Sequence, residues 1–312
     1  MKKILYTSAC LLAFAIGGCT KNVLKQTSNP ATGAQLKFVQ GVAGIPAVDE
    51  FVNGSKISPV QNLGVTDNSK PTSVITGIAY PSVFNTALQY GAMFPGGSST
   101  NYAAVAAGST TIKITTSTPL PLLVSPQTVA VNTTIATVTQ PLNDRTPYTL
   151  FTMGYPDKVT ALLVQDKFTG TDTTKAYIRF ANLVPNNTTA IDLKATYTIG
   201  TATTVTEFTA TPYGTVTDFI PVPVAPLGLT GYVFTAYNTG TATTVGAAAK
   251  SISLGANRYY TIVVNGLSAD YPVPGTSITL KASARPTAPT NPSSLLPEIY
   301  FNPPGISYYT SK

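Results

Sequence analysis

The chain has 312 residues, a net charge of +7, only 10% charged residues, and neither His nor Trp. Without His it cannot form a Ser-His-Asp or Cys-His catalytic arrangement, an imidazole proton shuttle or a histidine metal site, and we expect no cofactor or metal. Its lysines are scattered and lack the basic runs that follow phosphates, which argues against a nucleic-acid partner. Thr, Val, Ile and Tyr favour strands while Gly, Pro and Asn mark turns, so the composition predicts an all-β protein.

The first 19 residues have the order of an export signal. Two lysines precede an apolar run, residues 4–16, which is shorter than the roughly 20 residues of a membrane-spanning helix. IGGC, ending at Cys19, resembles the lipobox of bacterial lipoproteins. The resemblance implies cleavage before Cys19 and acylation of this cysteine. An ordinary secretory signal, or a short anchor that contains a cysteine, is the alternative.

Acylation at Cys19 would make the membrane a partner of the mature chain without any spanning helix. Two or more acyl chains hold a protein firmly to a bilayer. We therefore expect a cell-envelope protein anchored to the outer membrane. The absence of acidic residues in TKNVLK, residues 20–25, slightly favours the periplasmic face over the cell surface. Since Cys10 leaves with the signal, no internal disulfide can form, and stability must come from buried apolar surface.

Strand-like segments follow along the chain after a polar tether. They are short runs with period-two alternation or β-branched and aromatic enrichment, bounded by turn residues. VFNTALQYGAMF, residues 83–94, comes nearest to a helical period, and we predict strand and turn for it as well. The strand-like runs are AQLKFVQGV (34–42), STTIKITTS (109–117), YTLFTMG (148–154), TALLVQD (160–166), GYVFTAYNTG (231–240), RYYTIVVNG (258–266) and TSITLKASA (276–284).

An internal repeat indicates two similar units. AQLKFVQGVAGIPAVD, ending at Asp49, aligns with AYIRFANLVPNNTTAID, ending at Asp192, and this places Lys37 opposite Arg179. Two further matches follow in the same order, Tyr102 to Val105 with Phe219 to Val222 and YTLFTMG with YTIVVNG. GTATTV at 200–205 and again at 240–245 is predicted to be low-complexity strand sequence. The predicted segments are a signal peptide (1–18), a flexible tether (19–33), a first unit (34–173), a second unit (174–284) and a Pro-rich C-terminal segment (285–312).

Several of these segments together resemble a known bacterial family. PAVDEFVNG, LQYG, NYAAVAAGSTTIKI and YTLFTMG are similar to the domain of unknown function 4397, an immunoglobulin-like β unit often duplicated in lipoproteins of Bacteroidota. The resemblance implies an all-β protein of two tandem immunoglobulin-like β-sandwich domains in the cell envelope. It offers no activity or site, and the second copy lacks a glycine where Gly108 stands in the first.

The C-terminal segment after Ala284 contains six prolines, so it cannot continue a central strand. One interpretation is a linker-like tail. The other is that its apolar pieces, LLPEIYF and ISYY, dock along a sheet edge. We favour docking, because four aromatic residues would be unusual in a disordered tail.

Carboxylate chemistry remains an alternative, because glycosidases need only two suitably spaced acids. Asp49 and Glu50 are neighbours on a predicted strand and therefore point to opposite faces. Asp49 recurs as Asp192, and we interpret both as residues that bond local backbone. Asp166 and Asp172, in QDKFTGTD, flank a glycine turn; they could bind calcium, but a solvated hairpin fits the spacing better. We therefore expect no enzyme activity and no catalytic or metal-binding residue.

Tyrosine is abundant and could form stacking platforms for sugars, although core or edge packing is the commoner role. We predict a non-catalytic binding or structural role, with adhesion or glycan binding as one form of it and a glycan or protein as partner. A fimbrillin-like structural subunit, or less favourably a carboxylate-dependent glycoside hydrolase, is the alternative. The tyrosines considered are Tyr259, Tyr260, Tyr300, Tyr308 and Tyr309.

Overall fold

A computed structural model gives the structure of part of the chain. Residues 32–312 form one compact unit, and the described residues within it are all-β, as the composition predicted. The predicted signal peptide and Cys19 lie outside them. In the described part of the chain, no helix is both long and apolar enough to cross a membrane. The described residues are 32–45, 48–58, 60–62, 74–76, 93–95, 102–117, 128–199, 202–224, 231–246, 249–284 and 302–312.

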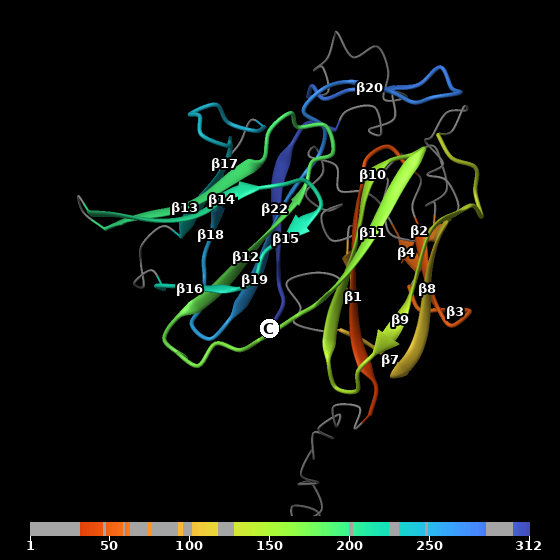
Figure 1. The fold of residues 1–312 in the computed structure, drawn as a ribbon, viewed down its shortest axis with the longest axis horizontal. Helices are drawn as coiled ribbons and strands as arrows, with labels where there is room; N and C mark the ends of the chain where they lie inside the picture. Colours follow the sequence, from red (N-terminus) through yellow and green to blue (C-terminus); the bar gives the residue numbers. More distant parts are fainter. Residues whose placement is uncertain are drawn as a thin grey trace, which may run out of the picture. The chain divides into compact units, whose positions relative to one another are not determined.

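The N-terminal part of the unit is a pair of facing sheets (Figure 1). In one sheet, β1 pairs in parallel with β10, β10 pairs antiparallel with β11, and β6 and β7 pair with the other edge of β1. The second sheet has the order β3-β2-β8-β9. The strands are β1 (Ala34–Val42), β2 (Val48–Val52), β3 (Ser55–Lys56), β6 (Met93–Phe94), β7 (Ala103–Val105), β8 (Gly108–Thr116), β9 (Thr134–Leu142), β10 (Pro147–Tyr155) and β11 (Lys158–Gln165).

The C-terminal part is a second pair of facing sheets. Here β12 pairs in parallel with β19, β22 pairs antiparallel with β19, and β15 and β16 pair with the other edge of β12. The facing sheet has the order β14-β13-β17-β18. The strands are β12 (Ala176–Leu183), β13 (Ile191–Ile199), β14 (Ala202–Thr211), β15 (Thr215–Val216), β16 (Ile220–Val222), β17 (Tyr232–Asn238), β18 (Lys250–Ile252), β19 (Tyr259–Asn265) and β22 (Gly305–Thr310).

Each pair of sheets encloses its own apolar core. Strand alternation turns Leu36 and Phe38 of β1 toward Val48, Ile112 and other residues of the facing sheet, which together form the first core. The second core is built in the same way, from one face of β12 and β19 against β13 and β17. It contains, among others, Ile178, Phe180, Ile262, Leu193 and Phe234.

The two five-stranded sheets also pack against each other, so that their central strands are buried on both faces. Val39 and Phe151 from one sheet meet Val263 and Tyr309 from the other in a third core. Leu183 packs directly on Gly41, where an added Cβ would lie 2.7 Å from Leu183 Cδ1 and 2.6 Å from the carbonyl oxygen of Thr152 on the neighbouring strand β10. A side chain at residue 41 would therefore overlap both β10 and the Leu183 side chain of the facing sheet.

Two smaller sheets complete the described strands. β20 (Tyr271–Pro272) and β21 (Thr279–Leu280) form a hairpin whose apolar residues pack against Ala43. Tyr271 of this hairpin stacks on Tyr155 at the end of β10, with ring centroids 3.7 Å apart. β4 (Val60–Asn62) pairs with β5 (Val74–Thr76).

The C-terminal segment is docked, as predicted, over the residues that the structure describes. β22, which contains ISYY, forms the outer strand of the β12 sheet through its pairing with β19. LLPEIYF lies outside the described residues, as do residues 83–92, so that only Met93–Phe94 of the near-helical segment is seen, as strand. The prediction that GTATTV is strand at both sites is wrong for residues 240–245, where the chain turns at Gly240.

A buried polar network as the candidate functional site

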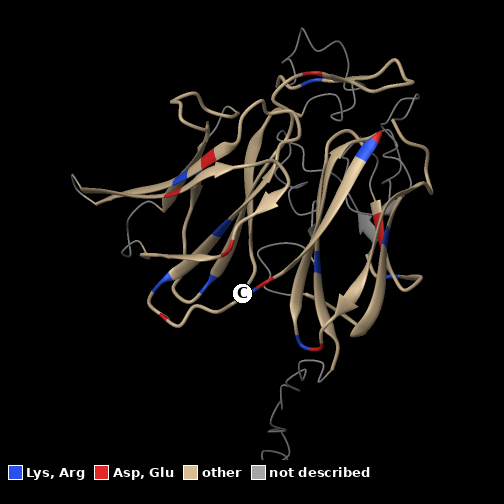
Figure 2. Ribbon diagram, viewed as in Figure 1, with Lys and Arg blue, Asp and Glu red and all other residues tan. Residues whose placement is uncertain are grey.

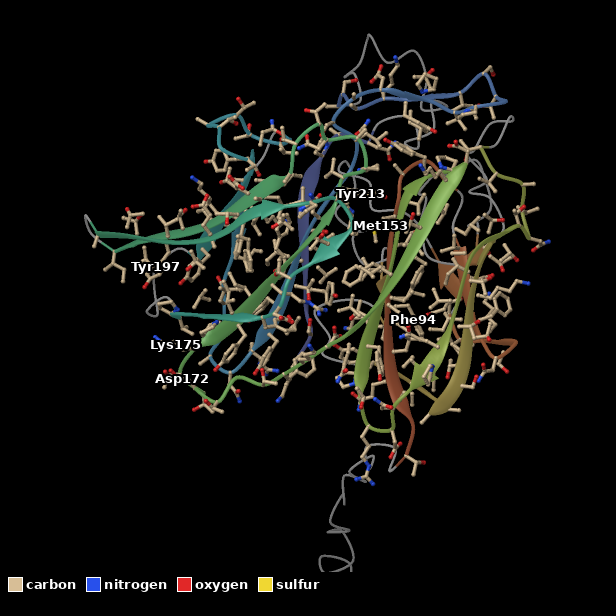
Figure 3. All side chains as sticks on the ribbon, in the orientation of Figure 1. Phe94, Met153, Asp172, Lys175, Tyr197 and Tyr213 are labelled. Carbon is tan, nitrogen blue, oxygen red and sulfur yellow. The ribbon has the colours of Figure 1, made fainter. Side chains whose placement is uncertain are left out.

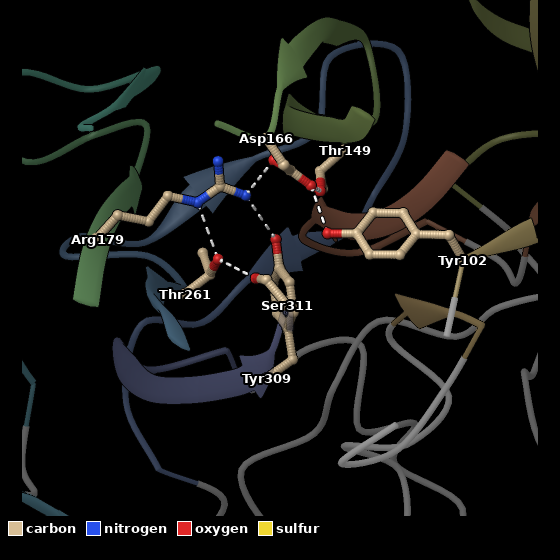
Figure 4. A network of polar contacts seen from close by, with 7 residues as sticks. All are labelled: Tyr102, Thr149, Asp166, Arg179, Thr261, Tyr309 and Ser311. Carbon is tan, nitrogen blue, oxygen red and sulfur yellow. Dashed lines mark hydrogen bonds and ion pairs between the residues drawn. The ribbon is translucent and has the colours of Figure 1, made fainter. Parts of the chain in front are cut away.

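The charged residues of the two central strands meet between the two five-stranded sheets. Because Leu36 and Phe38 enter the first core, Lys37 points out of the other face of its sheet, and the same alternation directs Arg179 outward from β12. The two sheets face each other there, so both cations are enclosed, with Lys37 0% and Arg179 1% exposed. Figure 4 shows the network that surrounds Arg179.

Arg179 forms a buried ion pair with Asp166, which directly follows β11. Its Nη2 lies 2.6 Å from Asp166 Oδ1, and both side chains are almost fully enclosed. Its Nε donates to Thr261 Oγ1 at 2.9 Å, and its Nη2 lies 3.4 Å from the Tyr309 hydroxyl. Burial is the largest single influence and acts to lower the pKa of Arg179, but the Asp166 carboxylate together with Tyr309 and Tyr102 outweighs it, and the pKa is raised. The guanidinium therefore stays charged inside the protein.

The other carboxylate oxygen of Asp166 accepts two hydrogen bonds from its own sheet. The Tyr102 hydroxyl and Thr149 Oγ1 both donate to Oδ2 at 2.6 Å (Figure 4). Burial, and next the Asp166 charge, raises the pKa of Tyr102, so that the phenol remains a donor. On the opposite sheet, Thr261 Oγ1 and Ser311 Oγ are hydrogen-bonded at 3.0 Å. The ion pair thus has polar partners from both sheets, as a buried ion pair requires.

Aromatic rings enclose the two cations. Lys37 Nζ lies 4.9 Å from the centre of the Tyr102 ring and 5.3 Å from that of Tyr309. Arg179 Cζ lies 4.5 Å from the centre of the Phe219 ring and 5.9 Å from that of Phe151. Burial lowers the pKa of Lys37 to about 8; Asp166 opposes this shift, and Arg179 adds to it. These cation–π contacts belong to the interface between the sheets.

The network holds the two sheets together and does not open into either of two surface pockets. One pocket, of about 340 Å³, is lined by residues that include Asp172, Lys175 and Phe219. A second, of about 320 Å³, is lined by residues that include Asn186 and Asn238. The network can therefore do structural work, whereas a ligand would have to bind at the surface.

The loop between β11 and β12 separates the two aspartates that sequence reasoning placed around one turn. Asp166 is 2% exposed and paired with Arg179, so the predicted solvated hairpin is wrong for this residue. Asp172 is exposed and accepts hydrogen bonds from the backbone N–H and the hydroxyl of Thr174. Figure 3 labels Asp172 and Lys175 at the far end of this loop. The two carboxylates therefore do not form one calcium site.

The same loop packs on Tyr177, one of the aromatic residues that line the first pocket. Gly170 lies flat against Tyr177, since a Cβ at residue 170 would overlap the ring. The Gly170 N–H donates to the Tyr259 hydroxyl at 2.9 Å, and the Tyr177 hydroxyl donates to the Asp172 carbonyl oxygen at 2.9 Å. The Tyr177 and Tyr259 rings are also stacked on each other, with centroids 4.5 Å apart, so they pack internally and do not form an open platform for a sugar. No group of His, Cys, Asp or Glu suited to a metal ion occurs among the residues that the structure describes.

The acids considered for hydrolysis are held in local structure. Asp49 and Glu50 point to opposite faces of β2, as predicted. Asp49 contacts Lys56 Nζ at 2.8 Å and accepts from Ser58 Oγ at 3.2 Å. Asp192 accepts from the backbone N–H groups of residues 210 and 240 and from the hydroxyl of residue 239, as expected of a residue that bonds local backbone.

Glu50 is the exception, because it lies in an apolar environment. It is 0% exposed on the first core, between Val48 and Val52 along β2. Neither of its carboxylate oxygens has a hydrogen-bond partner within the described part of the chain. Burial raises its pKa to about 8. Glu50 is therefore held protonated near neutral pH.

The tyrosines considered as stacking platforms are mostly internal. Tyr259, Tyr260 and Tyr309 are at most 7% exposed, in line with the interpretation as core or edge packing. Tyr308 is 38% exposed, and Tyr300 lies outside the described residues.

Sequence reasoning did not identify the pair formed by Arg179 and Asp166. One signal was present: AYIRFANLV places an arginine in a run that is otherwise largely apolar, and the aligned segment has Lys37 at the same position. A charge in a strand buried on both faces needs a partner. The identity of that partner depends on how the sheets pack.

The comparison with known families adds one match. Residues 82–194 match the family described as domain of unknown function (DUF4397), a little over a third of the chain. The match ends at Lys194 in β13, so it includes strands from both pairs of sheets. No curated protein matches the chain. The chain therefore contains a DUF4397 domain at residues 82–194.

Proposed function

We propose that this chain is a lipid-anchored cell-envelope protein with a non-catalytic binding or structural role. In this proposal Cys19 holds it to the outer membrane, on the periplasmic face, and two tandem immunoglobulin-like β-sandwiches form one stiff unit beyond the tether. The buried ion pair of Arg179 and Asp166 carries the proposal, because it fixes the two sandwiches relative to each other. A rigid pair of modules suits a protein that presents a surface or bridges a distance.

The duplicated architecture is supported by the strand register of the two five-stranded sheets. Lys37 pairs with Thr149 across the parallel strands β1 and β10, and Arg179 pairs with Thr261 across β12 and β19. Strands β7 and β16 lie at corresponding places, antiparallel to β1 and β12. Two units with the same pairing are what a tandem repeat would give.

A non-catalytic role is supported by the positions of the acids. Asp49 and Asp192 form local hydrogen bonds, and the Asp166 carboxylate is buried in an ion pair with Arg179. Within the described part of the chain, Glu50 is the one acid buried in the first core, whereas a glycosidase needs two acids facing one cleft. A carboxylate-dependent hydrolase is therefore the weakest alternative.

A fimbrillin-like subunit is disfavoured by the position of the first arginine. Such subunits are matured by cleavage after an arginine, and the first one here is Arg145. It lies between β9 and β10, and its N–H donates to the Gly33 carbonyl oxygen just before β1. Cleavage after Arg145 would separate β1 from its parallel partner β10 and disrupt the first sheet. A protein or glycan partner bound by the intact chain fits better.

The proposal is tested by fractionating cells that express the full chain or its Cys19→Ala variant. The wild type should stay in the membrane pellet after a high-salt wash, whereas Cys19→Ala should be released. Cys10→Ala is the matched control and should stay in the pellet. Retention of Cys19→Ala in the pellet would overturn the membrane anchor. In a separate experiment, a glycan array and a pull-down with the intact protein identify the class of binding partner.

A further inference from the structure

β14 is a long strand with a free edge. It is the terminal strand of its sheet and pairs only with β13 among the described strands. The pairing runs without interruption from Ala202 opposite Ile199 to Phe208 opposite Leu193. A register shift follows, and Ala210 has a positive φ of 46°. Residues 202–208 therefore present a regular row of backbone donors and acceptors.

The outer half of this hairpin has no charge. The sequence ATYTIGTATTVT, residues 195–206, contains no Lys, Arg, Asp or Glu, and Figure 2 shows the outer half of the β13–β14 hairpin without a coloured residue. The nearest acid, Glu207, lies 3.3 Å from Lys194 on the neighbouring strand. Soluble proteins usually protect long edge strands with charges, prolines or bulges, and these seven residues have no such protection beyond Glu207.

Three other edge strands of the described chain are short or protected. β9 is also long, but it contains Pro141 and packs beside β11. β3 and β18 are only two and three residues long, and each contains a lysine. β22 is also uncharged, but with six residues it is shorter than the ten-residue β14.

We propose that β14 pairs with β14 of a second copy of this chain, antiparallel, so that the two four-stranded sheets become one continuous sheet. Two identical strands carry the same charges, so the stretch that can pair with itself is the one that has none. Val205 is 52% exposed and Ile199 42%, the two most exposed large apolar residues of the described chain, and both belong to this hairpin. Thr, Val and Ile are also favoured in paired strands.

The pairing has a geometric consequence. In a two-fold antiparallel pair, one residue of β14 lies opposite its own copy, with Cβ atoms about 4.5–5.5 Å apart. Cysteines at that position are within reach of a disulfide, whereas cysteines one residue away are not directly opposed. The proposal does not depend on the membrane anchor, and its failure would leave the proposed function standing.

The test is a cysteine scan in the full chain with Cys10→Ser and Cys19→Ser. Four single-cysteine variants are each oxidised mildly, and the disulfide-linked dimer is quantified. They are Thr203→Cys, Thr204→Cys, Val205→Cys and Thr206→Cys. Thr137→Cys on the edge strand β9 is the matched control. One scanned position should give a clear maximum of dimer, and Thr137→Cys should give none.

A second measurement covers the case in which the cysteines perturb the strand. Sedimentation of the serine-substituted chain should show a monomer–dimer equilibrium. Val205→Lys should raise its dissociation constant about tenfold or more, because it brings like charges together. A chain that stays monomeric would overturn the proposal. The free edge of β14 could then pair only with a strand of a different protein. A dimer insensitive to Val205→Lys, or one crosslinked equally at Thr137→Cys, would also overturn it.

Discussion

The two five-stranded sheets place similar side chains at corresponding positions of their facing surfaces. Lys37 on β1 and Arg179 on β12 are the outward cations, and the parallel neighbours Thr149 and Thr261 lie opposite them. Each cation has an aromatic ring nearby on the strand-edge side of its own sheet, Tyr102 in one sheet and Phe219 in the other. Each sheet thus contributes one cation and one neighbouring threonine to the interface between them.

The sheets differ at the end of the outer strand. The Asp166 N–H donates to the carbonyl oxygen of residue 147, and the Ser311 N–H donates to that of residue 259, so that both residues end an outer strand in the same way. Asp166 supplies a carboxylate there and Ser311 only a hydroxyl. At this corresponding position, one sheet has Asp166 and the other has Ser311, and only Asp166 can supply the negative charge that pairs with Arg179. The stability of the protein should therefore depend more strongly on Asp166 than on Ser311.

The largest effect is expected from Asp166→Ala, because it leaves Arg179 buried without its counter-charge. The free energy of unfolding should fall by about 3–5 kcal/mol. Ser311→Ala at the corresponding position should cost about 1 kcal/mol or less. Chemical unfolding of both variants measures the difference, and equal losses would contradict the role assigned to the ion pair.

A double variant separates the charge from the packing. Asp166→Leu combined with Arg179→Met removes both charges, and it should be much closer to the wild type than Asp166→Ala. If the double variant were as unstable as the single one, the interface would depend on shape and not on charge.

The next effect concerns the outer strands, which have different origins. β11 follows β10 directly, whereas β22 is supplied by the C-terminal segment. Tyr309 of β22 is 1% exposed and pairs with Thr261, while Val164 of β11 is half-buried and pairs with Thr149. Tyr309→Ala should cost about 3–5 kcal/mol, the range for a large buried aromatic. Val164→Ala should cost about 1 kcal/mol, and thermal unfolding that ranked them in the opposite order would show that the tail is dispensable.

Local pattern was enough to predict the strands and several corresponding positions, because both depend on alternation within short segments. The ion pair could not be predicted in this way. QDKFTGTD resembles a solvated turn, and Asp166 is buried only because a second sheet covers it. The partner of Arg179 comes from another pair of sheets, and no spacing in the sequence encodes that packing.

The two copies of GTATTV also show that local sequence does not determine the structure of every segment, because the described residues of the two copies have different structures. Residues 202–205 of the first copy belong to β14, whereas the second copy, residues 240–245, begins a turn at Gly240. Asp192 accepts hydrogen bonds from the Gly240 N–H and from the Thr239 hydroxyl, which fixes that turn. Tertiary contacts thus override local propensity where both faces of a segment have similar residues.

The two cores differ at one buried position, and this gives a pH dependence. Glu50 faces the first core with a pKa raised to about 8 from 4.5, while Leu193 lies at the corresponding place on β13 in the second core. The folded state therefore binds the Glu50 proton more tightly than the unfolded state does. The free energy of unfolding should fall by about 1.4 kcal/mol per pH unit as the pH rises from about 4.5 to 8, and this contribution should be constant above 8.

Glu50→Gln should flatten this slope and leave the protein more stable at pH 8 than the wild type, and Glu50→Leu should do the same by copying the second core. Asp49→Asn, on the opposite face of β2, is the control and should preserve the slope. Urea unfolding at several pH values between 4.5 and 9 measures it. An unchanged slope in Glu50→Gln would mean that Glu50 is ionised in the folded protein.

The smallest effect is expected from the aspartates at corresponding positions on β2 and β13. Asp192 accepts three hydrogen bonds, one from the Ala210 N–H at the irregular end of β14 and two from the turn at residues 239 and 240. Burial acts to raise its pKa, but these bonds lower it. Among the described residues, the Asp49 carboxylate is paired with Lys56 and Ser58, near the surface. Asp192→Ala should cost about 1–2 kcal/mol and loosen the turn at Gly240, whereas Asp49→Ala should cost less than about 1 kcal/mol. Hydrogen exchange at the residue-240 amide distinguishes the two, because only Asp192→Ala should increase its rate, and an equal response to Asp49→Ala would show that the turn does not depend on the carboxylate.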